Sequence, residues 1–154
     1  MKSLVPEFEA MRARFPAGFA SSLVLPCLRR IQEERGFVAD ADIDELVGCL
    51  GVPRIQVEEA LSFYTQFRRR PIGRWHLQVC HNVSCSMRGA ETLLAHVQGK
   101  LGIAPGETTA DGRYTLTTVE CLGSCGTAPA MMINDRYIEN LTLQAVDDLL
   151  KELK

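Results

Sequence analysis

The 154-residue sequence lacks both a long hydrophobic run and an excess of charge of one sign. No stretch approaches the roughly 18 uninterrupted apolar residues of a transmembrane candidate, so we expect no direct membrane insertion. The 17 Lys and Arg residues nearly balance the 19 Asp and Glu residues, which leaves a net charge of −2. Because nucleic acids and anionic membrane surfaces attract basic proteins, this balance argues against nucleic acid or an anionic membrane surface as the main partner.

The sequence also lacks a secretory signal and the common nucleotide-binding motifs. Residues 15–28 are fairly apolar, but prolines and serines interrupt them and no A-x-A cleavage site follows. We therefore expect a cytoplasmic chain, in which the six cysteines are metal ligands or core residues rather than disulfides. The sequence has no G-x-G-x-x-G, no P-loop and no recognisable pair of catalytic carboxylates. The chain is thus expected to bind neither NADH nor flavin by itself.

Apolar residues recur with helical spacing through the first seventy residues. The pattern predicts helices over residues 21–35, 43–50 and 53–64. We expect Ser21 or Ser22 to cap the first helix, Pro53 to open the third, and glycines at 36 and 51 to end the first two. Short amphipathic helices with short loops form a bundle, so residues 1–70 are predicted to be a small N-terminal helical bundle. The run Arg68-Arg69-Arg70 is either part of a linker or a solvated helix end.

The periodicity changes to that of an α/β domain after Gly73. Strands are predicted over residues 74–79 and 114–119, with a helix over 90–101 between them, which implies a parallel crossover. A hairpin is predicted around Asn134-Asp135, and a last helix capped by Thr142. Four residues of that helix should face inward: Leu143, Val146, Leu149 and Leu150. The predicted class is α+β, with a helical bundle followed by an α/β domain with a mixed sheet over residues 71–154.

Four of the six cysteines occur in two pairs. Cys80 and Cys85 follow the first predicted strand, and Cys121 and Cys125 follow the second. The carboxyl ends of neighbouring parallel strands lie at one edge of a sheet, where such folds place ligands. We therefore expect the four sulfurs to converge, although the two pairs are far apart in the sequence.

The composition of the two cysteine loops favours a [2Fe–2S] cluster. Four thiolates, two ferric ions and two sulfides leave a net negative charge that grows on reduction, so such a site needs donors directed at sulfur. The glycines of residues 122–126 allow backbone amides to turn inward, and Ser84 and Ser86 offer further donors. A structural Cys₄ zinc site, a disulfide framework and four unrelated cysteines remain alternatives, although neither pair has the C-x₂-C spacing common in zinc ribbons.

The remaining candidates stand alone in the sequence. Cys27 and Cys49 each lie within a helical pattern, so we interpret them as small buried hydrophobes. His81 adjoins Cys80 and could be a ligand of the Rieske type, but four cysteines already complete the ligand count. Arg88, expected one turn into the next helix, is either a positive charge near the site or a solvated residue.

Several segments resemble a known family. They are VCHNVSC at residues 79–85, LGIAPGETTADGRYTL at 101–116, VECLGSC at 119–125, and VEEA with SFY at 57–64. Together they resemble the small thioredoxin-like [2Fe–2S] subunit of the NADH-dehydrogenase module of respiratory complex I. The similarity extends from about residue 23 to residue 150, and the first twenty residues match nothing recognisable.

The resemblance implies an N-terminal helical bundle and a thioredoxin-like domain that binds one [2Fe–2S] cluster. The implied ligands are Cys80, Cys85, Cys121 and Cys125, and the implied function is electron transfer within NADH:quinone oxidoreductase, with no independent catalytic site. The implied partners are a flavoprotein subunit that carries FMN and oxidises NADH, and a further iron–sulfur subunit of the peripheral arm on the cytoplasmic side of the membrane. Related subunits of NAD-linked hydrogenases and formate dehydrogenases, and a free [2Fe–2S] ferredoxin, are the alternatives.

Overall fold

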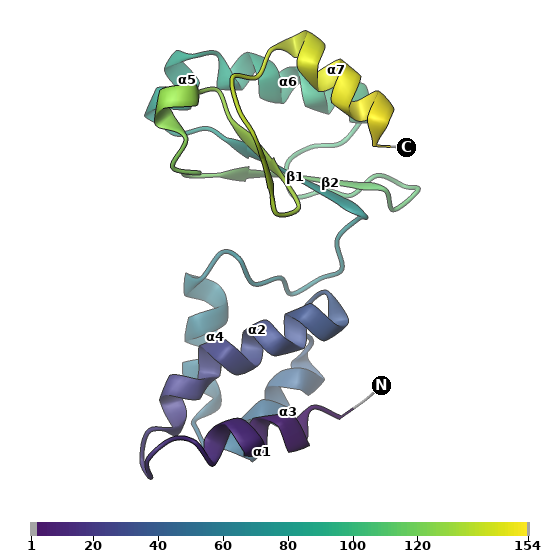
Figure 1. Ribbon diagram of the computed structural model, residues 1–154. Coiled ribbons are helices and arrows are strands. Elements are labelled where there is room, and N and C mark those ends of the chain that lie inside the picture. The colour runs from purple at the N-terminus through teal and green to yellow at the C-terminus, as the bar shows by residue number, and fades with distance from the viewer. Residues whose placement is uncertain (1–2, 154) are drawn as a thin grey trace. The chain divides into compact units, whose positions relative to one another are not determined.

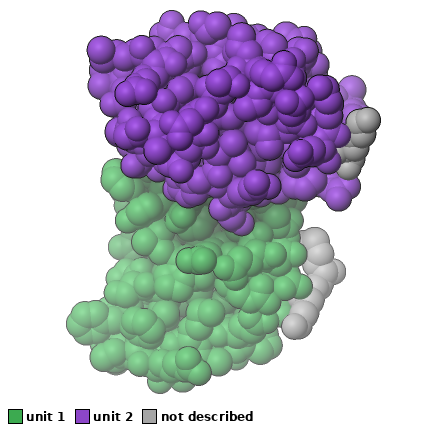
Figure 2. Space-filling model, turned by 45° about the horizontal axis from the view of Figure 1, so that its top comes forward, with its two compact units in different colours: residues 1–71 green, residues 72–154 purple. Residues whose placement is uncertain are grey.

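The computed structural model describes residues 3–153 of the chain. The chain divides into two compact units, residues 1–71 and 72–154, which are coloured separately in Figure 2. Within the described residues, the first unit contains only helices, and the second combines helices with a four-stranded sheet. The predicted α+β class is therefore confirmed. None of the described helices combines the length and the hydropathy that are needed to cross a bilayer.

The first unit is a helical bundle around its own core (Figure 1). Each helix buries one stripe of apolar side chains, such as Leu28 and Ile31 or Ile43 and Leu46. Glycine ends two helices at the predicted places, where Gly36 and Gly51 adopt the left-handed backbone conformation. The elements are α1 (Val5–Arg12), η1 (Ala20–Leu23), α2 (Val24–Arg35), α3 (Asp40–Leu50) and α4 (Arg54–Phe63).

Two predicted helix starts in this unit are wrong. Ser21 and Ser22 lie in the 3₁₀ turn η1, and α2 begins after it with no side-chain cap. Pro53 is the residue before α4 rather than its first residue, because its ψ of 139° is extended. Helix α1 lies in the segment that matched no pattern, and its Phe8 is fully buried in the bundle core. Tertiary packing therefore stabilises a helix whose sequence signal is weak.

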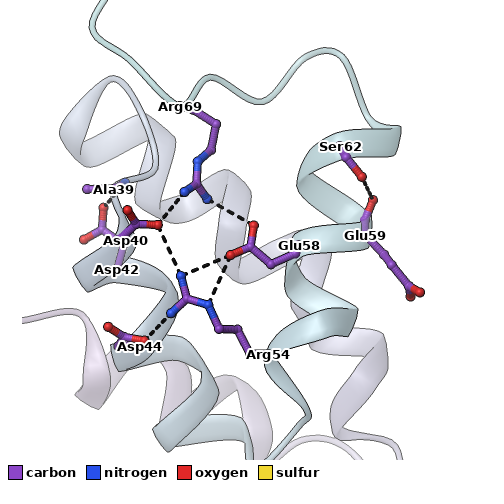
Figure 3. A network of polar contacts seen from close by, with 9 residues as sticks. All are labelled: Ala39, Asp40, Asp42, Asp44, Arg54, Glu58, Glu59, Ser62 and Arg69. Atoms are coloured by element: carbon purple, nitrogen blue, oxygen red, sulfur yellow. Dashed lines mark hydrogen bonds and ion pairs between the residues drawn. The ribbon is translucent and has the colours of Figure 1, made fainter.

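The arginine run after α4 is tied to the bundle. Phe67 is buried in the core, and the backbone of Arg68 bonds to both Val38 and Gln32. Arg69 pairs with Asp40 at 2.5 Å and with Glu58 at 3.5 Å. Figure 3 shows this group of ion pairs, in which Arg54 also contacts three carboxylates: Asp40, Asp44 and Glu58. Residues 67–69 thus pack as part of the first unit.

The second unit is built on a mixed sheet with the strand order β2-β1-β3-β4. Its strands are β1 (Trp75–Cys80), β2 (Tyr114–Val119), β3 (Met131–Ile133) and β4 (Arg136–Ile138). Strands β1 and β2 are parallel, as predicted, whereas β3 is antiparallel to both β1 and β4. In the predicted hairpin turn, Asn134 adopts a positive φ of 53° but Asp135 does not.

Helices α6 (Ala90–Leu101) and α7 (Leu143–Glu152) cover one face of this sheet (Figure 1). Leu77 and Val79 of β1 are buried in one cluster with Val97 of α6 and Val146 of α7. The predicted cap of α7 is confirmed, since Thr142 Oγ1 accepts a hydrogen bond from the Ala145 amide. The expected inward position of Leu143 is wrong: its side chain is 41% exposed. As the first residue of the helix it leans toward the N-terminus, beyond the packed face.

Candidate iron–sulfur site

The strand register places both cysteine loops at the same edge of the sheet. Cys80 is the last residue of β1 and pairs in register with Val119, the last residue of β2. The Cys80 amide also donates to the Ala130 carbonyl at 3.1 Å, and the His81 amide donates to the Val119 carbonyl at 3.2 Å. The two chain segments that leave the strands therefore begin side by side.

All four paired cysteines line one cavity of about 210 Å³. Cys80 and Cys85 are each 3% exposed and form its inner side, whereas Cys121 and Cys125 are exposed at the surface. The rest of the lining comes from the same two loops and from the residue before β3: Asn82, Val83, Ser84, Leu122, Gly123, Ser124 and Ala130. A ligand in this cavity would be held from inside the protein and still reach the surface.

A short helix that no sequence pattern predicted, α5 (Val83–Met87), carries Cys85. Asn82 precedes it, and its Oδ1 accepts a hydrogen bond from the Val83 amide at 2.7 Å. Ser86 Oγ donates to the His81 carbonyl at 2.8 Å. Ser86 thus stabilises the loop by bonding to its backbone. Contrary to our expectation, it does not donate a hydrogen bond to a cysteine sulfur. The signal for α5 was Asn82, since asparagine is a strong N-cap residue.

A backbone amide of the second loop is directed at sulfur. The Gly123 amide donates to Cys121 Sγ at 3.3 Å, and Gly123 has a φ of 74°. This left-handed conformation suits glycine, which is the reason for a glycine between the two cysteines. Such donors compensate the negative charge on thiolate ligands.

The electrostatics of the cavity show what would be needed to hold its cysteines as thiolates. Burial raises the pKa of the Cys85 thiol, and the neighbouring Cys80 and Cys125 raise it further. Several thiolates in one small cavity repel one another unless cations neutralise them. Ferric ions in a cluster provide that charge, so the donor set fits a [2Fe–2S] group.

The arrangement of the cysteines in two pairs fits a cluster. Among residues 3–153, no three His, Cys, Asp or Glu side chains are placed to hold one metal ion. A structural zinc site needs four ligands at about 2.3 Å from one point. A [2Fe–2S] cluster divides its four protein ligands between two irons, which suits two cysteine pairs on separate loops.

The other sequence candidates do not line this cavity. Cys27 is fully buried in the core of the first unit, with Cys49 partly buried against that core. His81 is near the cavity but does not line it, and its Nε2 lies 3.3 Å from Glu120 Oε1. Arg88 is an exposed residue at the end of α5 rather than one turn inside a helix.

The chain is similar to known proteins over most of its length. The model of the thioredoxin-like [2Fe–2S] ferredoxin family matches residues 8–154. The chain is 46% identical over 148 residues to a subunit of NADH-quinone oxidoreductase from Rhizobium meliloti, covering 96% of this chain and 87% of that protein. It is 39% identical over 143 residues to NADH-quinone oxidoreductase subunit 2 of Thermus thermophilus, covering 92% and 79%.

A solved structure is also similar. A chain of an NAD⁺-reducing [NiFe]-hydrogenase matches with a TM-score of 0.71 and 26% identity over 82% of this chain. The match covers only 22% of that much longer hydrogenase chain. The family match spans both units and includes all four cavity cysteines. The chain therefore belongs to the thioredoxin-like [2Fe–2S] ferredoxin family.

Proposed function

We propose that this chain is an electron-transfer subunit of an NADH:quinone oxidoreductase, complex I, and carries one [2Fe–2S] cluster. The observation that carries the proposal is one cavity lined by four cysteines from two parallel strand ends. Relatives that match over 96% and 92% of this chain are named as subunits of that enzyme, which supports the assignment. In this proposal residues 71–154 form the cluster domain, and residues 1–70 form a helical domain for assembly.

In this function the four cysteines hold the cluster as deprotonated thiolates. Cys80 and Cys85 supply sulfur from the buried side of the cavity, and Cys121 and Cys125 supply it at the surface. The Gly123 amide offsets part of the charge on Cys121. When bound, a [2Fe–2S] group takes up and releases one electron. The exposed cysteines make the second loop the natural side for electron exchange.

The electrons must come from another protein. The sequence has no nucleotide-binding motif, so the proposed donor is a flavoprotein subunit with FMN that oxidises NADH. We further propose contact with another iron–sulfur subunit in a peripheral arm, on the cytoplasmic side of the membrane. The six cysteines, none of which forms a disulfide, support that location.

Metal and sulfide analysis of the anaerobically purified protein tests the proposal. We expect about two irons and about two acid-labile sulfides per chain, with visible absorbance and an EPR signal after reduction. Stoichiometric zinc without sulfide would contradict the proposal, because a zinc site is colourless and needs no sulfide.

Serine substitutions test the ligand assignment. Replacing Cys80, Cys85, Cys121 or Cys125 by serine should remove or alter the cluster, because a harder oxygen ligand replaces a thiolate. The matched control is Cys49→Ser, which lies in the other unit and should keep the cluster spectrum. Loss of the cluster in the control, or its full retention in the four variants, would refute the assignment.

The hydrogenase similarity supports a second candidate, the equivalent subunit of an NAD-linked hydrogenase. Purification of the native complex through a tag on this chain distinguishes the two candidate functions. Recovery with membrane subunits supports complex I, and recovery with a hydrogenase or formate dehydrogenase large subunit supports the second candidate. A free ferredoxin would elute alone.

A further inference from the structure

The loop that carries Cys125 makes backbone hydrogen bonds with the segment that follows β4. The Thr127 carbonyl accepts a hydrogen bond from the Asn140 amide at 2.7 Å, and the Pro129 carbonyl accepts one from the Leu141 amide at 3.1 Å. Asn140 has a φ of 49°, which is uncommon for a residue other than glycine. Two consecutive amides of the later segment thus bond to the stretch just after Cys125.

The side chain of Glu139 adds a contact to the same loop. Thr127 Oγ1 lies 2.5 Å from Glu139 Oε1 and 3.3 Å from the Ser124 carbonyl. A hydroxyl has one proton to donate, so the shorter contact to the carboxylate takes it. Hydrogen bonds from Thr127 and, second, from the Ser124 side chain hold the pKa of the Glu139 carboxyl below its ordinary value. Glu139 is therefore an anion near neutral pH, and its carboxylate accepts a hydrogen bond from Thr127, two residues after Cys125.

We propose that Glu139 is a positioning residue for the cluster, acting through Thr127 to hold the loop that presents Cys125. This inference rests on the proposed function. The negative charge of Glu139 has a second effect, on the reduction potential. A carboxylate fixed against this loop disfavours the extra negative charge of the reduced cluster. Glu139 would thus both retain the cluster and lower its reduction potential.

Two variants and one control separate these two effects. Glu139→Gln keeps an acceptor oxygen but removes the charge, so the potential should rise while the rate of cluster loss to a chelator stays close to wild type. Glu139→Ala removes both, so the potential should rise and cluster loss should be several-fold faster. The control Glu152→Gln makes the same charge change at the end of α7, where the Leu153 carbonyl bonds to Tyr114 at the opposite end of β2 from the cysteines. It should change neither quantity.

Thr127→Val tests the route through the hydroxyl. It should also accelerate cluster loss, and adding Glu139→Ala to it should accelerate the loss little further, because both changes break one contact. Independent, fully additive effects would overturn the proposed route. A potential in Glu139→Gln equal to that of Glu152→Gln, or a wild-type loss rate in Glu139→Ala, would overturn the inference.

The same samples distinguish this inference from the function on which it rests. Wild-type protein with a normal [2Fe–2S] content and unchanged Glu139 variants would refute only the role of Glu139. Wild-type protein without iron and sulfide would refute the proposed function and this inference with it. Glu139 is exposed, so its substitutions should leave the fold and its thermal unfolding unchanged.

Discussion

The cysteines of this chain lie in two kinds of environment. Four line a cavity that opens at the surface, whereas Cys27 is enclosed in the apolar core of the helical bundle. Burial, with a smaller contribution from Cys49, raises the pKa of the Cys27 thiol to about 12. A thiol of this kind stays protonated at neutral pH and is a poor nucleophile and a poor metal ligand.

This raised pKa predicts that wild type and Cys27→Ala differ in how their stability changes at high pH. A thiol in the unfolded chain ionises near pH 8.5, so between about pH 8.5 and 12 the unfolded state loses the proton first. The free energy of unfolding of the wild type should therefore fall as pH rises, and the Cys27 contribution is at most about 1.4 kcal/mol per pH unit. Cys27→Ala should cost about 1–2 kcal/mol near neutral pH and lack this contribution.

Urea denaturation of both proteins between pH 8 and 11 checks the prediction. The stability advantage of the wild type over Cys27→Ala should shrink as pH rises and reverse before pH 11, because about 1.4 kcal/mol per pH unit soon exceeds about 1–2 kcal/mol. The cluster spectrum should stay the same in both proteins. Parallel stability curves over this range would show that Cys27 titrates normally.

At the scale of elements, a buried ion pair joins α2 to α3. Arg35 and Asp42 are in contact, and Asp42 is 1% exposed and also accepts a hydrogen bond from the Ala39 amide at 2.8 Å. Arg35 has a second carboxylate, Glu45, at 3.4 Å. Because both charges have left water, the pair stabilises the bundle only while it is complete.

Asp42→Asn should therefore be strongly destabilising. We expect a loss of about 3 kcal/mol in the free energy of unfolding, since removal of one partner leaves a charge in the interior. The control is Asp40→Asn on the same helix, whose side chain is 74% exposed within the ion pairs of Figure 3. Its cost should stay below about 1 kcal/mol. Equal costs in urea denaturation would contradict the distinction.

The start of α7 offers a second test at this scale. Thr142 Oγ1 is the side-chain cap of the helix, so Thr142→Ala should lower the free energy of unfolding by about 1 kcal/mol. Thr142→Ser retains the hydroxyl and should keep most of this stability. If serine and alanine are equally destabilising, then the methyl group rather than the cap is responsible.

At the scale of the whole molecule, the proposed function predicts that reduction of the cluster depends on a flavoprotein partner. NADH should not reduce the cluster of the isolated chain, and addition of the flavoprotein subunit should permit reduction if the two potentials allow it. Visible and EPR spectra of anaerobic mixtures check this. Prompt reduction by NADH without flavoprotein would reveal a nucleotide site in this chain.

Local patterns were sufficient to predict most elements of this fold. Glycines at the ends of α2, α3 and α6 are readable because few other residues adopt the left-handed conformation. The change of period after Gly73 predicted β1 and β2, and their parallel pairing placed both cysteine loops at one edge. The candidate site could be predicted because strand topology relates residues that are distant in sequence.

Other features depend on neighbours that no local pattern specifies. Helix α1 is held by the core around Phe8, and Leu143 is exposed although its spacing places it on the apolar stripe. The contacts of Asp42 with Arg35 and of Glu139 with Thr127 join different elements or loops. The sequence around a polar residue does not show which residue will contact or bury it. That partner is set only when helices, strands and loops pack together, because burial and hydrogen bonding are properties of the assembled chain.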